Sequence, residues 1–197
     1  MLTTSIINPY YDEALPHLKG LCRFKERDQL VTKYAWSIPT NPVIGLLSSL
    51  FGQIVEIGAG TGYWASLLQQ CGAQVVPFDK HPQHNPYRHH PHWVPVYEGT
   101  EEVLSKFGPR WTLLLGWPPY EDSMAEHTLA AFRGKHLIYI GEDRWGCCAT
   151  HEFFQQLDQS WTRLHVYELP QWSGIHDQVE VWERGTRKRI GWKEIPT

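Results

Sequence analysis

Three glycines at alternate positions, preceded by an acidic residue, form the arrangement in this sequence most suited to ligand chemistry. The stretch from Gln53 to Gly62, QIVEIGAGTG, places Glu56 two residues before Gly58 and continues with Gly60 and Gly62. Its apolar start reads as a strand, and the residues after it read as a helix. Glycine reaches positive φ and lacks a Cβ, so such a backbone can turn sharply and approach a ligand closely. The stretch is therefore predicted to cradle a ligand.

The spacing excludes two other kinds of glycine loop. A phosphate loop ends in Gly-Lys-Ser/Thr, and a dinucleotide fingerprint needs its third glycine where this chain has Tyr63. The remaining pattern, E-x-G-x-G-x-G, resembles motif I of the class I S-adenosylmethionine (SAM)-dependent methyltransferases. In that family the acidic residue, here Glu56, helps to hold the cationic methionyl end of the cofactor, and the glycines let the backbone pass under it. A glycine turn that serves packing alone is the alternative.

A second acidic residue ends the next predicted strand. The apolar run QVVPFDK reaches Asp79, twenty-one residues beyond Gly58. An acid about twenty residues past a glycine loop can accept hydrogen bonds from both ribose hydroxyls of an adenosine. We therefore expect Asp79 to bind the ribose, and a plain carboxylate at a strand end is the alternative.

The motif GWPPY, residues 116–120, follows the fourth predicted strand. It stands where amino-methylating members of the resembled family carry Asn/Asp-Pro-Pro-Tyr, which orients the target amine. Trp117 takes the place of the polar residue, and an indole has one hydrogen-bond donor and no acceptor. The Trp117 carbonyl and the ring or hydroxyl of Tyr120 remain as possible substrate contacts. A Pro-Pro turn that merely ends the strand is the alternative.

The resemblance implies a site along the carboxyl ends of the strands. The residues expected to bind the cofactor are Tyr34, Glu56, Gly58, Ala59, Gly60, Gly62, Tyr63, Trp64, Asp79, Lys80, Glu98, Gly116, Trp117 and Pro118. Trp117, Tyr120 and His176 are expected to act in catalysis. Glu142 and Asp177 are further candidates for a general base, which is needed only if the nucleophile carries a proton. Tyr34 and Trp36 precede the glycine loop, where the family often covers the cofactor.

Strands and helices alternate along the chain. The predicted strands cover 54–57, 74–79, 93–97, 111–115, 136–140, 161–169 and 178–183. The predicted helices after the glycine loop cover 63–70, 101–107, 123–133 and 150–159. This alternation predicts an α/β fold, a Rossmann-like and mostly parallel seven-stranded sheet with helices on both faces, and the loop between the last strands predicts an antiparallel edge hairpin. We expect a single domain over 1–197, with an N-terminal helical cap over 11–50 and the core over 51–197.

The composition of the chain argues against some classes of binding partner. The net charge of -3 gives no general attraction to nucleic acid or to anionic membrane, and no run of residues has the length of a membrane span. The basic cluster of Arg184 and residues 187–189 reads as a solvated strand end. The histidine-rich stretch HPQHNPYRHHPH lacks the ligand spacing of a zinc or iron site, so no metal is expected. A cytoplasmic protein without nucleic-acid or membrane partners is the expectation.

The sequence thus predicts a SAM-dependent methyltransferase that acts on a small molecule and releases S-adenosylhomocysteine (SAH). Methyl transfer from a sulfonium is an in-line displacement, which positioning and desolvation can promote without a catalytic triad or a metal. Two alternatives remain open. A SAM-using enzyme of this kind could instead transfer the aminocarboxypropyl group or cyclise the cofactor, and a binding protein could retain the cradle without catalysis.

Overall fold

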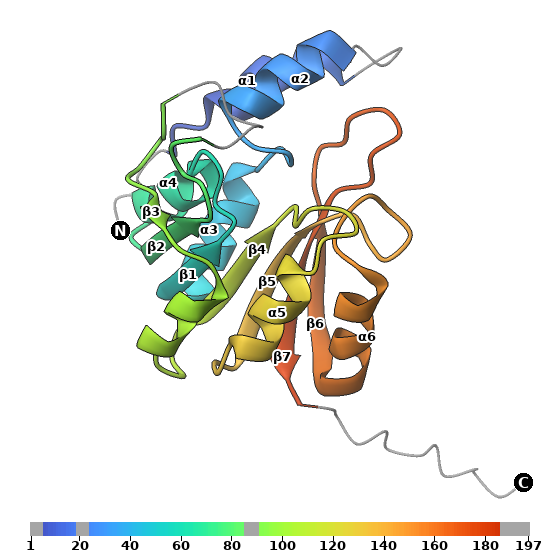
Figure 1. The fold of residues 1–197 in the computed structure, drawn as a ribbon. Helices are drawn as coiled ribbons and strands as arrows, with labels where there is room; N and C mark the ends of the chain where they lie inside the picture. Colours follow the sequence, from blue (N-terminus) through green and yellow to red (C-terminus); the bar gives the residue numbers. More distant parts are fainter. Residues whose placement is uncertain (1–5, 19–23, 85–90, 186–197) are drawn as a thin grey trace, which may run out of the picture.

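The computed structural model describes residues 6–18, 24–84 and 91–185, and it is built around one seven-stranded sheet (Figure 1). The strands are β1 (Gln53–Ile57), β2 (Gln74–Asp79), β3 (Tyr97–Glu98), β4 (Thr112–Gly116), β5 (His136–Gly141), β6 (Trp161–Glu168) and β7 (Gln178–Arg184). Their order is β3-β2-β1-β4-β5-β7-β6. Strands β1 to β5 pair in parallel, whereas β7 runs antiparallel to both β5 and β6. The predicted mixed sheet with an antiparallel edge hairpin is confirmed.

Helices cover both faces of the sheet. Helices α3 (Asn41–Leu50) and α4 (Tyr63–Gln70) pack on one face, and η2 (Glu101–Lys106, a 3₁₀ helix), α5 (Met124–Ala131) and α6 (His151–Ser160) pack on the other. Successive strand side chains point to opposite faces, so Ile54 and Leu114 join the first core while Val55 and Leu113 join the second. All four are fully buried. Two apolar layers therefore hold the central strands and fix where their carboxyl ends lie.

A short helical cap lies across the end of the sheet (Figure 1). It consists of α1 (Pro9–Ala14), η1 (Leu15–His17) and α2 (Phe24–Lys33), so it begins slightly before the predicted residue 11. Proline suits the first turn of α1, because its missing N–H has no partner within the helix at that position. Tyr10 and Ala14 are fully buried in the same core as α3 and α4. The cap is thus packed onto the body of the protein.

The third strand differs from its prediction. The sequence predicts a third strand over 93–97, whereas the strand β3 consists of Tyr97 and Glu98 alone and pairs with β2. The Trp93 N–H instead donates to the carbonyl of Thr61 in the glycine loop, at 2.9 Å. Val94 and Val96 pack against the start of α4 at Gly62. The apolar alternation of this segment therefore serves the glycine loop rather than the edge of the sheet.

None of the helices in the described ranges has the length and apolar composition of a membrane span. Most of the basic C-terminal cluster, residues 187–189, lies outside the described residues, as do residues 85–90 of the histidine-rich stretch.

Candidate functional site

A cavity of about 780 Å³ opens at the carboxyl ends of β1, β2 and β4. The cap, the glycine loop, the start of η2 and the loop from β4 to α5 surround it. The expected site residues that line it are Tyr34, Glu56, Gly58, Ala59, Gly60, Tyr63, Trp64, Asp79, Lys80, Gly116, Trp117 and Tyr120. Residues from four separate parts of the chain thus meet in one place, as parallel strands bring their carboxyl ends to one edge of a sheet.

Four expected site residues do not line the cavity: Gly62, Glu98, Pro118 and His176. Gly62 has φ 72 at the start of α4, and a Cβ there would lie 2.9 Å from the Val96 side chain, so its backbone serves packing. Glu98 lies on the exposed edge strand β3. Pro118 is buried, and its carbonyl accepts the N–H of Ala149 at 3.0 Å.

Glu56 places a buried carboxyl group at the cavity. Only 3% of it is exposed, and its Oε2 atom has no hydrogen-bond partner among the residues that the structure describes. Burial, with the neighbouring charge of Asp79, raises the pKa of Glu56 to about 8. A buried carboxylate is unfavourable unless it is paired, so this oxygen is suited to a cationic group of a ligand.

Asp79 ends β2 and braces the glycine loop from the neighbouring strand. Its Oδ2 atom accepts the N–H of Gly60 at 2.9 Å, and its Oδ1 atom accepts the N–H of His81 at 3.0 Å. Each oxygen of an ionised carboxylate can accept more than one hydrogen bond. Asp79 therefore shapes the loop and also lines the cavity.

The glycine loop needs its glycines for two different reasons. Gly58 and Gly60 have φ values of 76 and 54, in the left-handed region that side chains disfavour. A Cβ on Gly58 would also lie 2.6 Å from the Cε of Met124, which lines the cavity from the start of α5. A Cβ on Gly60 would meet nothing within 4 Å, so there the backbone conformation and the open cavity set the requirement.

Tyr34 joins the cap to the cavity wall. Its ring stacks on Tyr10 with centroids 4.8 Å apart and planes 9° apart, and its hydroxyl donates to Glu13 at 2.8 Å. The Thr61 hydroxyl in the glycine loop donates to the carbonyl of Tyr34. The residue expected to cover the cofactor is thus fixed to both the cap and the loop.

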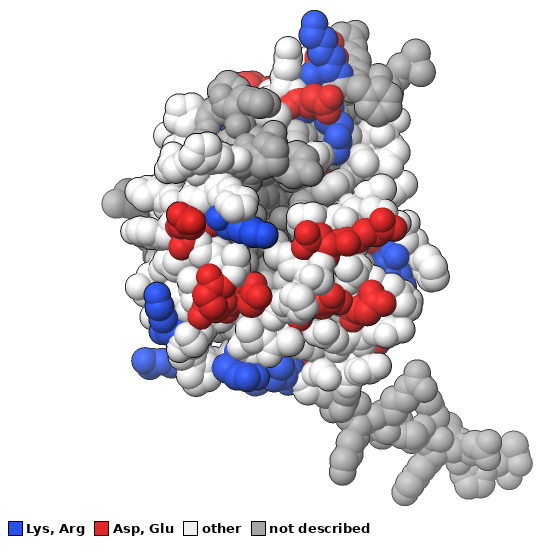
Figure 2. Space-filling view, in the orientation of Figure 1, with Lys and Arg blue, Asp and Glu red and all other residues white. Residues whose placement is uncertain are grey.

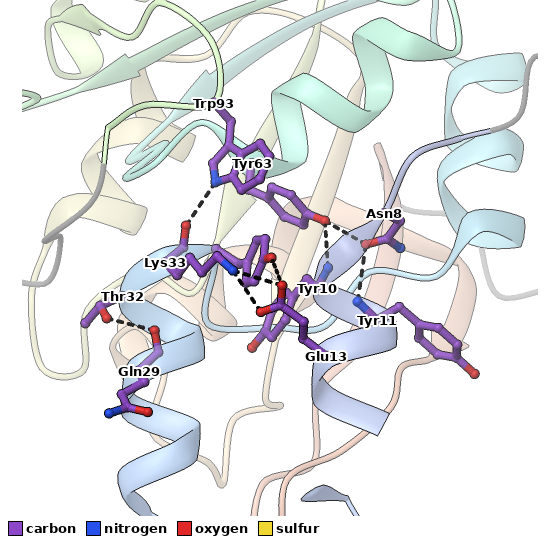
Figure 3. A network of polar contacts seen from close by, with 10 residues as sticks. Asn8, Tyr10, Tyr11, Glu13, Gln29, Thr32, Lys33, Tyr63 and Trp93 are labelled. Carbon is purple, nitrogen blue, oxygen red and sulfur yellow. Dashed lines mark hydrogen bonds and ion pairs between the residues drawn. The ribbon is translucent and has the colours of Figure 1, made fainter. Parts of the chain in front are cut away.

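A second set of contacts ties the cap to α4 (Figure 3). The Tyr63 hydroxyl donates to Asn8 at 2.8 Å and accepts the N–H of Tyr10 at 3.2 Å. Trp93 packs edge-on against Tyr63 and donates its indole N–H to the carbonyl of Lys33 at 2.9 Å. The aromatic residues of this region hold the cap over the cavity rather than filling it.

Trp117 leaves the end of β4 with φ 48, an uncommon conformation for a residue with a side chain. Its indole N–H donates to Oδ1 of Asp177 at 2.7 Å. Its ring stacks on Trp36 of the segment after α2, with centroids 5.0 Å and planes 14° apart. Arg27 lies 5.3 Å from the centre of the Trp36 ring. Trp117 thus forms a fixed apolar wall between the cap and the sheet.

Of the four candidates for a general base, one lines the cavity and three do not. Tyr120 lines the cavity and is 59% exposed, whereas His176, Glu142 and Asp177 do not line it. Glu142 accepts the N–H groups of Cys147 and His176 at 2.8 and 2.9 Å and so joins two loops. Asp177 is fully buried, and burial raises its pKa to about 7 although the Trp117 hydrogen bond opposes the rise.

The cavity also contains residues that the sequence did not indicate. The loop after GWPPY and the first turns of α5 bring Asp122, Ser123, Met124 and His127 to it, and the loop after β5 brings Cys147. Their place directly after the carboxyl ends of β4 and β5 is a signal that could have identified them. In the described ranges, no group of three or more His, Cys, Asp and Glu side chains is arranged to hold a metal ion.

Neither a protein-family model nor a curated protein sequence matches the chain. Solved structures match its fold. A mutant of MtNAS in complex with S-adenosylmethionine has a TM-score of 0.54 at 13% identity, over 90% of this chain and 72% of that one. Magnesium protoporphyrin IX methyltransferase from Synechocystis PCC 6803 with bound SAM has a TM-score of 0.48 at 12% identity, over 91% and 96% of the two chains. N-methyltransferase NodS from Bradyrhizobium japonicum WM9 in complex with SAH has a TM-score of 0.47 at 15% identity, over 92% and 100%.

The chain has a Rossmann-like α/β fold, which it shares with the SAM-bound mutant of MtNAS. At these identities the likeness shows the fold alone, and the activity has to be argued from the cavity. Within this fold, the glycine loop after β1 and the carboxylate that ends β2 line the same cavity.

Proposed function

We propose that the protein is a single-domain SAM-dependent methyltransferase that acts on a small molecule. The observation that carries the proposal is the buried carboxylate of Glu56, which lines the cavity with an oxygen that no described residue satisfies. The α-ammonium group of SAM is a cation that would pair with this oxygen. Its binding would compensate a charge that is otherwise unfavourable in the interior.

The rest of the cofactor fits the same part of the cavity. The Asp79 carboxylate lines the cavity at the end of β2 and would accept hydrogen bonds from the ribose hydroxyls, and a Cβ on Gly60 would meet nothing within 4 Å. The cavity volume of about 780 Å³ lies within the range of small-molecule sites and leaves room for an acceptor beside the cofactor. Lys80, directly after Asp79, lines the adjacent wall.

SAM supplies a methyl group on a sulfonium, and its transfer leaves the neutral thioether SAH. The protein has to place the acceptor in line with that methyl group and to exclude water from both. The stacked Trp36 and Trp117 and the side chain of Met124 provide apolar walls for this purpose. Tyr120 is the candidate in the cavity that can hydrogen-bond a nucleophile or take part in removing its proton.

Cofactor binding is tested first by titration calorimetry with SAM and SAH. We expect one site, and we expect Glu56→Gln to weaken SAM binding by about 1.5 to 3 kcal/mol, the loss of a hydrogen bond to a charged group. Glu152→Gln, an exposed change on α6, is the matched control and should bind as the wild type does. A folded protein that binds neither compound would overturn the proposal.

The chemistry is tested with methyl-labelled SAM and a pool of small metabolites. Methyl transfer produces SAH and a labelled acceptor. Aminocarboxypropyl transfer or cyclisation of the cofactor would instead release methylthioadenosine, and a binding protein would release neither product. Mass spectrometry of the products therefore separates the methyltransferase from both alternatives.

A further inference from the structure

Five backbone N–H groups around the cavity donate to carboxylates of the chain itself. Five residues that line the cavity share this feature: Gly60, His81, Thr100, Met124 and Cys147. Asp79 accepts from the first two, and Glu102 accepts from Thr100 at 3.3 Å. Asp122 accepts from Met124 and Glu142 accepts from Cys147, each at 2.8 Å.

These N–H groups are of the kind that bind anionic ligands in other proteins. The N-terminus of a helix and the amides of loops at strand ends attract phosphate and carboxylate groups. At the start of α5 the place of such an anion is taken by the Asp122 carboxylate. Its Oδ1 atom accepts the N–H of Met124, the first residue of the helix. An anionic acceptor would have to displace a carboxylate that is tethered to the site.

The charged side chains of the cavity also disfavour an anionic acceptor. Among the described residues that line it, Glu56, Asp79, Glu101 and Asp122 carry carboxylates, Lys80 is the single lysine or arginine, and His81 and His127 are the histidines. Figure 2 shows acidic side chains across the middle of the face in view, with one basic patch among them and most other basic side chains toward the edges. With Glu56 and Asp79 engaged by the cofactor, Glu101 and Asp122 remain to act on the acceptor.

We propose that the methyl acceptor is a small organic molecule that bears a positive charge or none, such as an aromatic amine, and that phosphates and carboxylates are excluded. The inference rests on the proposed function and deepens it. The ring of Tyr120, exposed at the cavity, offers an aromatic surface to such a molecule. Attraction between the negative cavity and a cation, together with contact to aromatic rings, would select it.

The charge preference is tested with two probes that share an indole ring. Tryptamine carries an ammonium group and indole-3-propionate carries a carboxylate. We expect SAH-saturated protein to bind tryptamine at least about tenfold more tightly at low salt, with a smaller difference at high salt, because screening weakens exposed charges. Equal binding, or tighter binding of indole-3-propionate, overturns the proposal.

Asp122→Asn separates the charge from the structural role of this side chain. Asparagine keeps an oxygen for the Met124 N–H and removes the negative charge. We expect tryptamine affinity to fall by about two- to fivefold while SAH affinity stays unchanged. Glu152→Gln should leave the affinity for both probes unchanged. An Asp122→Asn protein with the full wild-type preference for tryptamine would contradict the role given to Asp122.

A metabolite pool provides the second measurement. The pool is divided by ion exchange into an anionic fraction and a fraction of cations and neutral molecules, and each is incubated with methyl-labelled SAM. We expect label only in the second fraction, and label in the anionic fraction overturns the inference. If SAM binds but neither fraction is labelled, the proposed function fails, and the preference between the two indole probes still decides the charge inference.

Discussion

Glu56 can couple the release of a proton to cofactor binding. Its carboxyl group is buried beside Asp79, and its pKa of about 8 means that it is mostly protonated in the free protein near neutral pH. A cation placed next to it favours the ionised form and lowers its pKa. Binding of the SAM ammonium group should therefore release a proton from Glu56.

Calorimetry in buffers of different ionisation enthalpy measures this release. At pH 6.5 we expect SAM binding to release about one proton, and the number should fall toward zero as the pH rises above 8. The Glu56→Gln protein has no carboxyl group at this position and should release none. A binding enthalpy that does not depend on the buffer would show that the cofactor leaves Glu56 protonated.

Asp79 combines a ligand contact with a structural one. We expect Asp79→Ala to weaken SAH binding by about 1 to 3 kcal/mol, the scale for losing hydrogen bonds to a charged group. It should also lower the melting temperature slightly, because the N–H groups of Gly60 and His81 lose their acceptor. Calorimetry and thermal unfolding measure the two effects. Unchanged SAH affinity would remove Asp79 from the ribose site.

Within the glycine loop, some glycines are needed for stability and others for cofactor binding. Gly62→Ala places a Cβ 2.9 Å from Val96 and 3.0 Å from Val94, at φ 72, and we expect it to reduce stability by about 1 to 3 kcal/mol. Gly60→Ala meets nothing within 4 Å, so we expect a smaller loss of stability and a larger loss of SAM affinity. Urea unfolding and calorimetry of the two proteins distinguish these effects. The reverse pattern would contradict the separation.

The end of β4 is the element that defines the acceptor side. Trp117→Asn removes the ring that stacks on Trp36 and the N–H that Asp177 accepts. Asparagine tolerates the left-handed φ of this position, so the fold should persist. We expect SAH affinity to stay within about threefold and methyl transfer to the acceptor to fall, because a polar group replaces a large apolar contact.

Trp117→Phe serves as the control, since it removes the N–H but keeps an apolar, although smaller, aromatic ring. It should retain more turnover than Trp117→Asn. If asparagine instead preserves or improves methylation of an amine, the Trp117 position orients the amine as in the family motif. In that case the apolar contact made by Trp117 is not required for methyl transfer to the acceptor.

At the scale of the whole molecule, buried carboxyl groups make stability depend on pH. Burial raises the pKa of Glu56 to about 8 and that of Asp177 to about 7, from about 4 in the unfolded chain. The folded protein therefore binds more protons than the unfolded chain between these values. The stability that these groups contribute is fully present below about pH 4 and is lost as the pH rises through 7 to 8.

Urea unfolding at several pH values between 5.5 and 8.5 measures this dependence. We expect the free energy of unfolding of the ligand-free protein to fall over this range, and we expect a shallower fall in Glu56→Gln. Saturating SAM should also reduce the Glu56 part of the dependence, because the paired carboxylate no longer favours its proton. Equal slopes in the wild type and Glu56→Gln would show that Glu56 does not titrate as described.

The parts of the fold that follow from local patterns were predictable. The period of apolar residues and the glycine turns indicated each strand after β1 within a few residues, except the third. Glu56 and Asp79 were placed by their distance along the chain from Gly58, and both line the cavity. Such signals need no knowledge of distant contacts, because a strand that leads into a glycine turn is formed by consecutive residues.

The use of the remaining polar and aromatic residues was decided only by the tertiary structure. Trp117 meets Asp177 sixty residues later, and Trp93 meets Tyr34 and Tyr63 instead of continuing a strand. Glu142, a candidate base in the sequence, accepts a pair of loop N–H groups, whereas no described residue donates a hydrogen bond to Oε2 of Glu56. A carboxylate stabilises a loop when the packed chain brings N–H donors to it, and it is available to a ligand when the chain does not. That arrangement exists only once the cap, the sheet and the loops have assembled.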